Sequence, residues 1–136
     1  MKYFVTVQAS QADYDAMSGS AGSGSPRWSP EDIRAMLAFM NELNAELADS
    51  GELLDGQGFT APAEARFVTG SPGRSAVVTD RPYAEDDVQP AGYWLLECSG
   101  LDRVTEIAAR ITQCPAPEGS PERPVVIRPV GEAPTP

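Results

Sequence analysis

The loop between residues 80 and 90 holds the densest group of side chains in this chain that could do chemistry. The candidates for contact with a small ligand are Asp80, Arg81, Tyr83 and Glu85. Loops on a rigid scaffold commonly hold binding residues, and a tyrosine offers both a ring and a hydroxyl group. The competing interpretation is structural: Asp80 bonds the backbone amides of its own turn, and Asp86 and Asp87 form a solvated charge run.

The residue types that are missing limit the chemistry further. The chain has 136 residues, two cysteines and no histidine. The missing histidine excludes Ser-His and Cys-His nucleophile pairs, histidine-ligated metal sites and the usual near-neutral general base. The acidic loop fits no calcium-loop spacing. The glycines of residues 18–25 match neither a dinucleotide fingerprint nor a P-loop. We therefore expect no metal and no cofactor.

Charge and composition restrict the partners and the compartment. The formal net charge is −10, which disfavours nucleic acid and anionic membrane surfaces. No apolar run approaches the roughly 18 residues of a membrane-spanning helix, and no signal-peptide pattern follows Met1. Two cysteines are too few for a disulfide framework. These features predict a cytoplasmic protein with free thiols.

The order of the predicted elements indicates one domain over residues 1–132 and a disordered tail over 133–136. The spacing of apolar and turn residues predicts strands over 2–9, from 53, over 66–69, 75–79, 92–98 and 123–130. A first helix should begin at Ser29 and stop at Gly51, and a second should begin with a capping box of Ser99 and Asp102. Residues 10–29 read as a flexible loop.

This order, β-α-β, an inserted β-hairpin, then β-α-β, predicts an α+β fold of the ferredoxin-like βαββαβ type. In that arrangement an antiparallel sheet carries two helices on one face. The strands over 2–9 and 92–98 nevertheless have apolar side chains on both faces. The helices cover one face, so the other needs a second cover. The pattern therefore predicts a homodimer that packs sheet to sheet.

Three segments resemble the YCII-related family, specifically its DGPF-domain branch. They are VVTDRPYAE (77–85), AGYWLLEC (91–98) and VVIRPV (125–130), and the passages MKYFVTV and LLDGQGF fit as well. The resemblance implies a dimeric α/β barrel with a cleft near the interface of each protomer. It also implies a small cytoplasmic bacterial protein of unestablished activity, and a link to a sigma-factor system, because some DGPF-type proteins are associated with extracytoplasmic-function sigma factors.

The sequence departs from the family pattern at its signature. The family's Asp-Gly-Pro-Phe stands here as Asp80-Arg81-Pro82-Tyr83. Arginine takes a positive φ less readily than glycine, so either this turn needs no positive φ or its conformation differs. Some family members have a proposed His-Asp pair, and this chain has no histidine to receive that role.

Two functions from different classes fit these observations. The first is a homodimeric small-molecule-binding or regulatory accessory module without a cofactor. The second is a histidine-free isomerase- or lyase-like enzyme that uses Tyr, Asp or Glu in the dimer cleft. The missing histidine favours the first. The sequence leaves the ligand unidentified, and it does not distinguish a lid from a disordered loop over residues 18–25.

Overall fold

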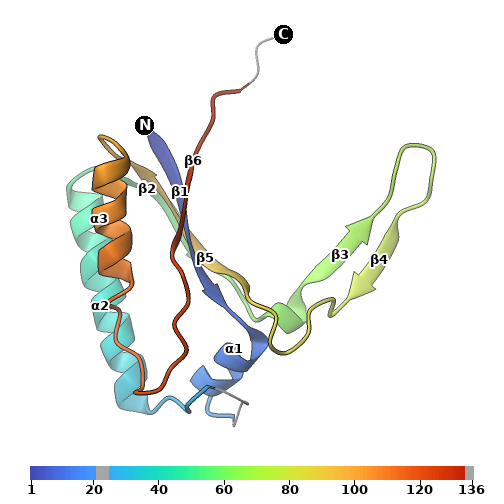
Figure 1. Cartoon of the computed structure of the whole chain (residues 1–136), viewed down its shortest axis with the longest axis horizontal. Helices are drawn as coiled ribbons and strands as arrows, with labels where there is room; N and C mark the ends of the chain where they lie inside the picture. Colours follow the sequence, from blue (N-terminus) through green and yellow to red (C-terminus); the bar gives the residue numbers. More distant parts are fainter. Residues whose placement is uncertain (21–24, 134–136) are drawn as a thin grey trace.

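The computed structural model describes residues 1–20 and 25–133 and has an α+β fold (Figure 1). The centre of the predicted loop (21–24) and the end of the predicted tail (134–136) lie outside the described residues. In chain order the elements are β1 (Lys2–Ala9), α1 (Gln11–Met17), α2 (Pro30–Asp49), β2 (Leu53–Gly58), the 3-10 helix η1 (Pro62–Glu64), β3 (Arg66–Thr69), β4 (Val77–Asp80), β5 (Gln89–Glu97), α3 (Leu101–Ile111) and β6 (Val126–Pro129).

A four-stranded antiparallel sheet in the order β2-β5-β1-β6 forms the body. Helices α2 and α3 cover one face of this sheet (Figure 1). Because side chains alternate across a strand, Val5 and its partner Trp94 point to the helices, whereas Phe4 and its partner Leu95 point to the other face. We call this second face, which neither α2 nor α3 covers, the open face.

The core lies between the sheet and the two helices. Its buried members include Leu43 and Leu47 of α2, together with Val104, Ile107 and Ile111 of α3. These positions recur at helical spacing, so they present one apolar stripe to the sheet. The sequence predicts one apolar stripe on each helix, at Ile33, Met36, Leu37, Met40, Leu43 and Leu47 and at Leu101, Val104, Ile107, Ala108 and Ile111. These stripes are confirmed at the buried residues named above. Leu37 and Leu101, which were expected to belong to them, are 49% and 58% exposed.

Helix α2 begins where its capping signals predict. The Ser29 side chain accepts from the amide of Asp32, and the Asp32 carboxylate accepts from the amide of Ser29. Pro30 occupies the first turn, where its missing N–H is no loss. At the far end Gly51 has φ 79°, the left-handed conformation that ends many helices.

The predicted loop over residues 10–29 is wrong in its first part, which forms α1. Ser10 and Asp13 build a second capping box, with Ser10 almost completely buried. Only seven residues long, this helix lacks a long apolar periodicity, and its caps and tertiary contacts stabilise it instead.

The capping box predicted for α3 is also wrong. Gly100 rather than Ser99 is the N-cap, and no side chain caps this end. Burial of four positions on α3, which are Val104, Ile107, Ala108 and Ile111, supplies the stability that the missing cap would have added.

Residues 66–81, which we call the arm, hold the hairpin of β3 and β4 as the sequence predicts. The arm projects from the end of the sheet, on the side opposite α2 and α3 (Figure 1). Arg66 pairs with Asp80 and Val68 with Val78 in the hairpin register. All residues of both strands are exposed.

Candidate functional site

The four side chains predicted to bind a ligand lie at the base of the arm. Asp80 accepts a hydrogen bond from Arg66 Nε across the hairpin at 2.6 Å. The ring of Tyr83 meets that of Phe67 edge to face, with centroids 5.2 Å apart. Arg81 and Glu85 are exposed. Of these four residues, none lines any of the three hollows described below.

The expected turn-capping role belongs to a different aspartate. Asp87, which the charge run suggested to be merely solvated, accepts from the amide of Ala84 at 2.7 Å. Asp80 instead lies within β4, where its carboxylate forms the cross-strand ion pair. Arg81 follows with φ 47°, so this turn does need a residue with positive φ, and arginine takes that conformation here.

A groove of about 380 Å³ lies between α2 and the strands β2 and β5, and we call it the α2 groove. Its lining holds no charged side chain and consists of Val7, Met36, Leu37, Met40, Asn44, Leu53, Gly56, Gln57, Gly58, Ala91, Gly92, Tyr93 and Trp94. Methionine side chains adapt to irregular ligand shapes because they are unbranched and polarizable.

Glycines on β2 and β5 make room for this groove. A Cβ atom on Gly92 would lie 3.0 Å from the carbonyl oxygen of Gln57, so the two strands approach too closely there for a side chain. Gly58, the register partner of Gly92, has nothing within 4 Å of an added Cβ. Both positions share the helix-facing side of the sheet with Trp94. Their lack of side chains leaves the space above them empty.

One polar contact crosses the groove. Trp94 Nε1 donates to Asn44 Oδ1 at 2.8 Å, which joins the sheet to α2. The Asn44 oxygen accepts this bond, and among the described residues the Asn44 NH₂ group donates no hydrogen bond. The groove thus combines an apolar lining with one polar handle, the usual composition of small-molecule sites.

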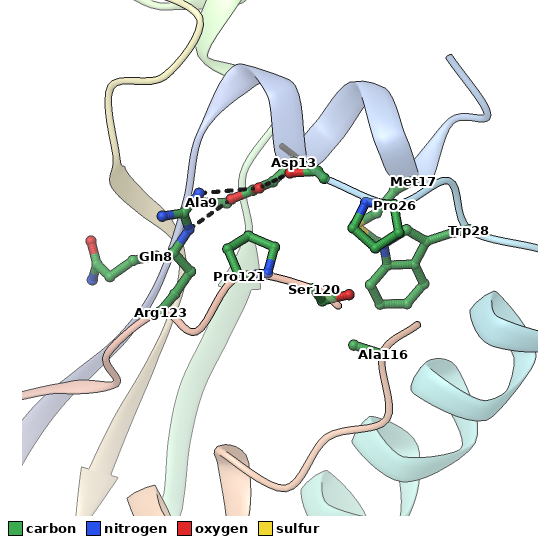
Figure 2. Close-up of a pocket in the computed structure, with 11 residues that line it drawn as sticks. Gln8, Ala9, Asp13, Met17, Pro26, Trp28, Ala116, Ser120, Pro121 and Arg123 are labelled. Carbon is green, nitrogen blue, oxygen red and sulfur yellow. Dashed lines mark hydrogen bonds and ion pairs between the residues drawn. The ribbon is translucent and has the colours of Figure 1, made fainter. Parts of the chain in front are cut away.

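A second hollow of about 180 Å³ lies beside α1, with Trp28 forming part of its wall (Figure 2). Arg123 donates from Nε and Nη2 to the carboxylate of Asp13, at 3.0 and 3.3 Å. Burial raises the pKa of Asp13, but hydrogen bonds from Arg123, Ser10 and Ser25 outweigh it, so the net pKa is lowered. This half-buried pair ties α1 to the segment that precedes β6, so its main effect is structural.

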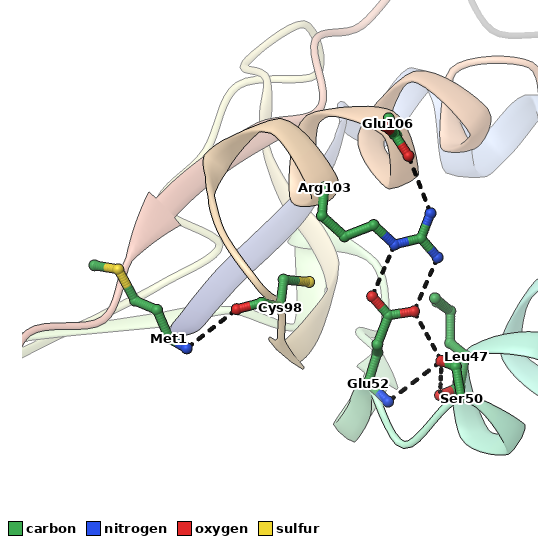
Figure 3. Close-up of polar contacts among 7 residues, drawn as sticks. All are labelled: Met1, Leu47, Ser50, Glu52, Cys98, Arg103 and Glu106. Atoms are coloured by element: carbon green, nitrogen blue, oxygen red, sulfur yellow. Dashed lines mark hydrogen bonds and ion pairs between the residues drawn. The ribbon is translucent and has the colours of Figure 1, made fainter.

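A polar cluster at the opposite end of the sheet joins the ends of several elements (Figure 3). Arg103 of α3 donates two hydrogen bonds to Glu52, at 2.8 and 2.9 Å. These bonds are the main reason why the pKa of Glu52 falls to about 2. Burial raises the pKa of the nearby Cys98 thiol, so this cysteine is a poor nucleophile.

Aromatic side chains gather on the open face. Tyr93 stacks on Phe4 with centroids 5.1 Å apart and lies 5.8 Å from the ring of Phe59. Its hydroxyl donates to Asp55 Oδ2 at 2.7 Å, and this hydrogen bond raises the pKa of Tyr93. The sequence predicted apolar residues on this face, but the Tyr93–Asp55 pair requires the β2–β5 register, which only the structure provides.

A third hollow, of about 400 Å³, lies next to η1. Gln89 lines it, and the Nε2 atom of that side chain is buried without a hydrogen-bond partner among the described residues. Across residues 1–20 and 25–133, no group of three acidic, cysteine or histidine side chains is placed to hold a metal ion. The helices in that same part of the chain are all too short or too polar to cross a membrane.

Sequence reasoning missed the α2 groove because its residues come from distant segments. The signals were present in the glycine-rich DGQG passage and in Met36 and Met40, whose helical spacing placed them in the apolar stripe of the first helix. What was missing was the pairing of β2 with β5, which places Gly58 opposite Gly92.

Comparison with known proteins adds little about activity. No family model matches the chain. A protein of Rhizobium meliloti (strain 1021), described as uncharacterized, is 26% identical over 109 residues, which cover 79% of this chain and 87% of that protein. The chain is therefore similar to a protein of nearly the same extent, and the site must be interpreted from its own geometry.

Proposed function

We propose that this chain is a homodimeric small-molecule-binding module whose ligand occupies the α2 groove. The observation that carries the proposal is a groove of about 380 Å³ without a charged side chain in its lining. Small-molecule sites typically measure roughly 300–1,000 Å³ and combine apolar walls with a few polar groups. The lining also lacks a carboxylate and a cationic side chain, which favours binding over acid-base catalysis at this site.

The lining defines the class of ligand. A neutral, largely apolar molecule fits, because a charged one would lose its hydration without gaining a partner charge. The NH₂ group of Asn44 suits a carbonyl or hydroxyl oxygen on that ligand. A flat aromatic or short aliphatic body would pack against Met36, Met40 and the indole of Trp94.

The neutral fluorescent probe N-phenyl-1-naphthylamine tests this assignment. We expect the parent protein to bind it with increased probe fluorescence and with quenching of tryptophan emission. Gly58→Leu should weaken binding of the probe at least tenfold, because the new side chain enters the groove. The variant should still fold, because a Cβ atom at this position meets nothing within 4 Å. Gly131→Leu is the matched control, since it makes the same change outside the groove. Equal probe binding by both variants and the parent would exclude the α2 groove as the site.

The arrangement of the sheet supports a ferredoxin-like fold. When the four strands β1, β2, β5 and β6 are numbered first to fourth in chain order, they stand side by side across the sheet in the order second, third, first, fourth. Helix α2 follows the first of these strands and α3 follows the third, which is the βαββαβ pattern. The arm is then an insertion between the second and third strands of the sheet.

The exposed area supports the homodimer and the dimeric α/β barrel. A monomer of 14.5 kDa should expose about 6,900 Å². This chain exposes 8858 Å². The chain therefore exposes about 2,000 Å² more than a compact monomer of this mass. A stable interface removes about 800 Å² from each partner, so a second copy on the open face accounts for a large share of this excess.

The signature turn supports membership of the DGPF-domain branch of the YCII-related family. Arg81 stands where the family has glycine, and its φ of 47° is a backbone conformation that glycine adopts without strain. The backbone at Arg81 thus has the conformation that a glycine at this position of the signature would readily adopt.

A second candidate function rests on the Tyr93–Asp55 pair on the open face. A tyrosine that donates to a carboxylate at 2.7 Å is an arrangement suited to proton transfer in an isomerase- or lyase-like reaction. In a sheet-to-sheet dimer this pair would lie in the interior between the two sheets. Tyr93→Phe removes the proton donor and leaves the ring, so it should abolish turnover while the dimer persists. A Tyr93→Phe variant with full activity on a substrate of the parent would exclude this role.

A further inference from the structure

We infer that the arm, residues 66–81, is a dimerisation arm that packs against a second copy of this chain. The inference rests on the proposed homodimer and adds to it a second contact outside the open face. Four features of the arm support it: its exposed apolar side chains, its attachment to α1, its charge and its position on the same side of the sheet as the open face.

The arm exposes apolar side chains on both of its faces. Phe67, Val68, Val77 and Val78 are between 42% and 63% exposed. In the hairpin register Val68 lies opposite Val78 on one face, while Phe67 and Val77 lie on the other. An isolated two-stranded hairpin is only marginally stable in water, and an exposed apolar strand pair is an aggregation risk. A second protein surface resolves both difficulties.

The arm is held in a fixed direction by α1. Before the arm, the amide of Ala63 donates to the side chain of Gln11 at 2.7 Å. After it, the carbonyl of Glu85 accepts from the amide of Ala12 at 3.1 Å. Both roots of the arm are therefore bonded to the same helix. A rigidly presented arm loses little conformational entropy on docking, which favours association.

The charge of the arm is opposite to that of the rest of the chain. Residues 66–81 contain three arginines and one aspartate, a formal charge of +2. The whole chain carries −10, so all other residues together carry −12. Asp80 pairs with Arg66, whereas Arg74 and Arg81 have no ion pair among the described residues. Arg74 lies in the turn at the tip, where its amide donates to Ser71.

This difference in charge between the arm and the rest of the chain indicates which partner binds the arm. A second copy supplies both an apolar open face and an acidic body, so it complements the arm in both respects. The arm lies on the same side of the sheet as the open face, opposite α2 and α3 (Figure 1). A copy that packs on the open face therefore lies on the side to which the arm extends.

Sedimentation equilibrium at 50 and 500 mM NaCl tests the inference by measuring the dimer dissociation constant. Arg74→Glu, in the turn, should weaken dimerisation at least tenfold at low salt and less at high salt, because salt screens the lost attraction. Val68→Ser combined with Val78→Ser should weaken it about tenfold at both salt concentrations. Arg34→Glu is the control: it changes the net charge equally but lies on α2, and we expect less than a threefold effect.

The outcomes separate the two proposals. If both arm variants dimerise as tightly as the parent while Phe4→Asp on the open face yields monomers, the homodimer stands and the arm inference is wrong. If the parent itself is monomeric at every concentration, both the homodimer and the arm inference are wrong. An equal loss of affinity in Arg74→Glu and Arg34→Glu would show that only net charge matters, which also overturns the specific role of the arm.

Discussion

At the residue scale, the clearest strain lies at Arg81. A non-glycine residue in the left-handed region costs roughly 1–2 kcal/mol relative to its ordinary conformations. The φ of 47° places Arg81 in this region, next to Pro82, whose own φ is restricted. We predict that Arg81→Gly raises the free energy of unfolding by about 0.5–1 kcal/mol, as measured by urea denaturation. Arg74→Gly at the tip should bring no such gain, and a clear loss of stability in Arg81→Gly would contradict the strain argument.

A second residue-scale prediction concerns the Glu52–Arg103 pair. The pKa of Glu52 falls from 4.5 to about 2, mainly through the hydrogen bonds from Arg103. A folded-state pKa below the unfolded value stabilises the protein above pH 4.5, and this contribution is lost as the pH falls towards 2. Glu52→Gln should therefore lower the free energy of unfolding by roughly 1–3 kcal/mol at pH 7, and the difference should shrink at pH 3.

The control for this prediction is a more exposed pair. Glu46 and Arg110 are each about half exposed, at 50% and 44%, so water weakens their attraction. Glu46→Gln should change stability by less than about 0.5 kcal/mol at either pH. A pH-independent effect of Glu52→Gln would show that packing, rather than charge, accounts for the loss.

At the element scale, the elements that depend on neighbouring residues were predictable from the sequence, and those that depend on distant contacts were not. The start of α2 was predictable because Ser29, Pro30 and Asp32 act within one turn. The hairpin was predictable because its turn residues adjoin its strands. Helix α1 was not, because seven residues carry too little periodicity to identify a helix, and because its bonds to Ala63 and Glu85 come from distant parts of the chain.

The same contrast applies to the candidate site. The sequence indicated an acidic loop, but it could not show that Asp80 would pair with Arg66 across the hairpin. Likewise, Gly58 and Gly92 are separated in the chain and meet only through strand pairing. Grooves between distant elements depend on register, which no local pattern specifies.

Two serines give a test at this scale: one caps a helix in the structure, and the other was predicted from the sequence to do so but does not. Ser10 is buried and makes the capping box of α1, whereas Ser99 makes no capping bond. We predict that Ser10→Ala lowers the free energy of unfolding by about 1–2 kcal/mol. Ser99→Ala should change it by less than about 0.5 kcal/mol, as for most exposed positions. If Ser99→Ala were the more damaging variant, the N-terminus of α3 would have the cap that its sequence suggests.

At the scale of the whole molecule, the two faces of the sheet differ in how well they are shielded from water. The helices shield one face of the sheet, while the open face and the arm leave aromatic and β-branched side chains in contact with water. A surface of this kind is explained if association is part of folding. The free energy of unfolding would then depend on protein concentration, because Phe4, Tyr93 and Leu95 on the open face would be buried only when two copies associate.

Equilibrium unfolding at several protein concentrations measures this dependence. For a folded dimer that dissociates into unfolded chains, the free energy of unfolding at the working concentration rises by about 1.4 kcal/mol for each tenfold increase. We therefore predict that the urea midpoint of the parent rises steadily as the protein concentration increases from about 1 to about 100 µM, a range on the order of typical dimer dissociation constants. Phe4→Asp places a charge on the open face, so it should lower the midpoint and remove most of its concentration dependence. A parent midpoint that stays constant over this range would mean that the open face is stable in water without a second copy, and its stacked aromatic pair would then be the reason.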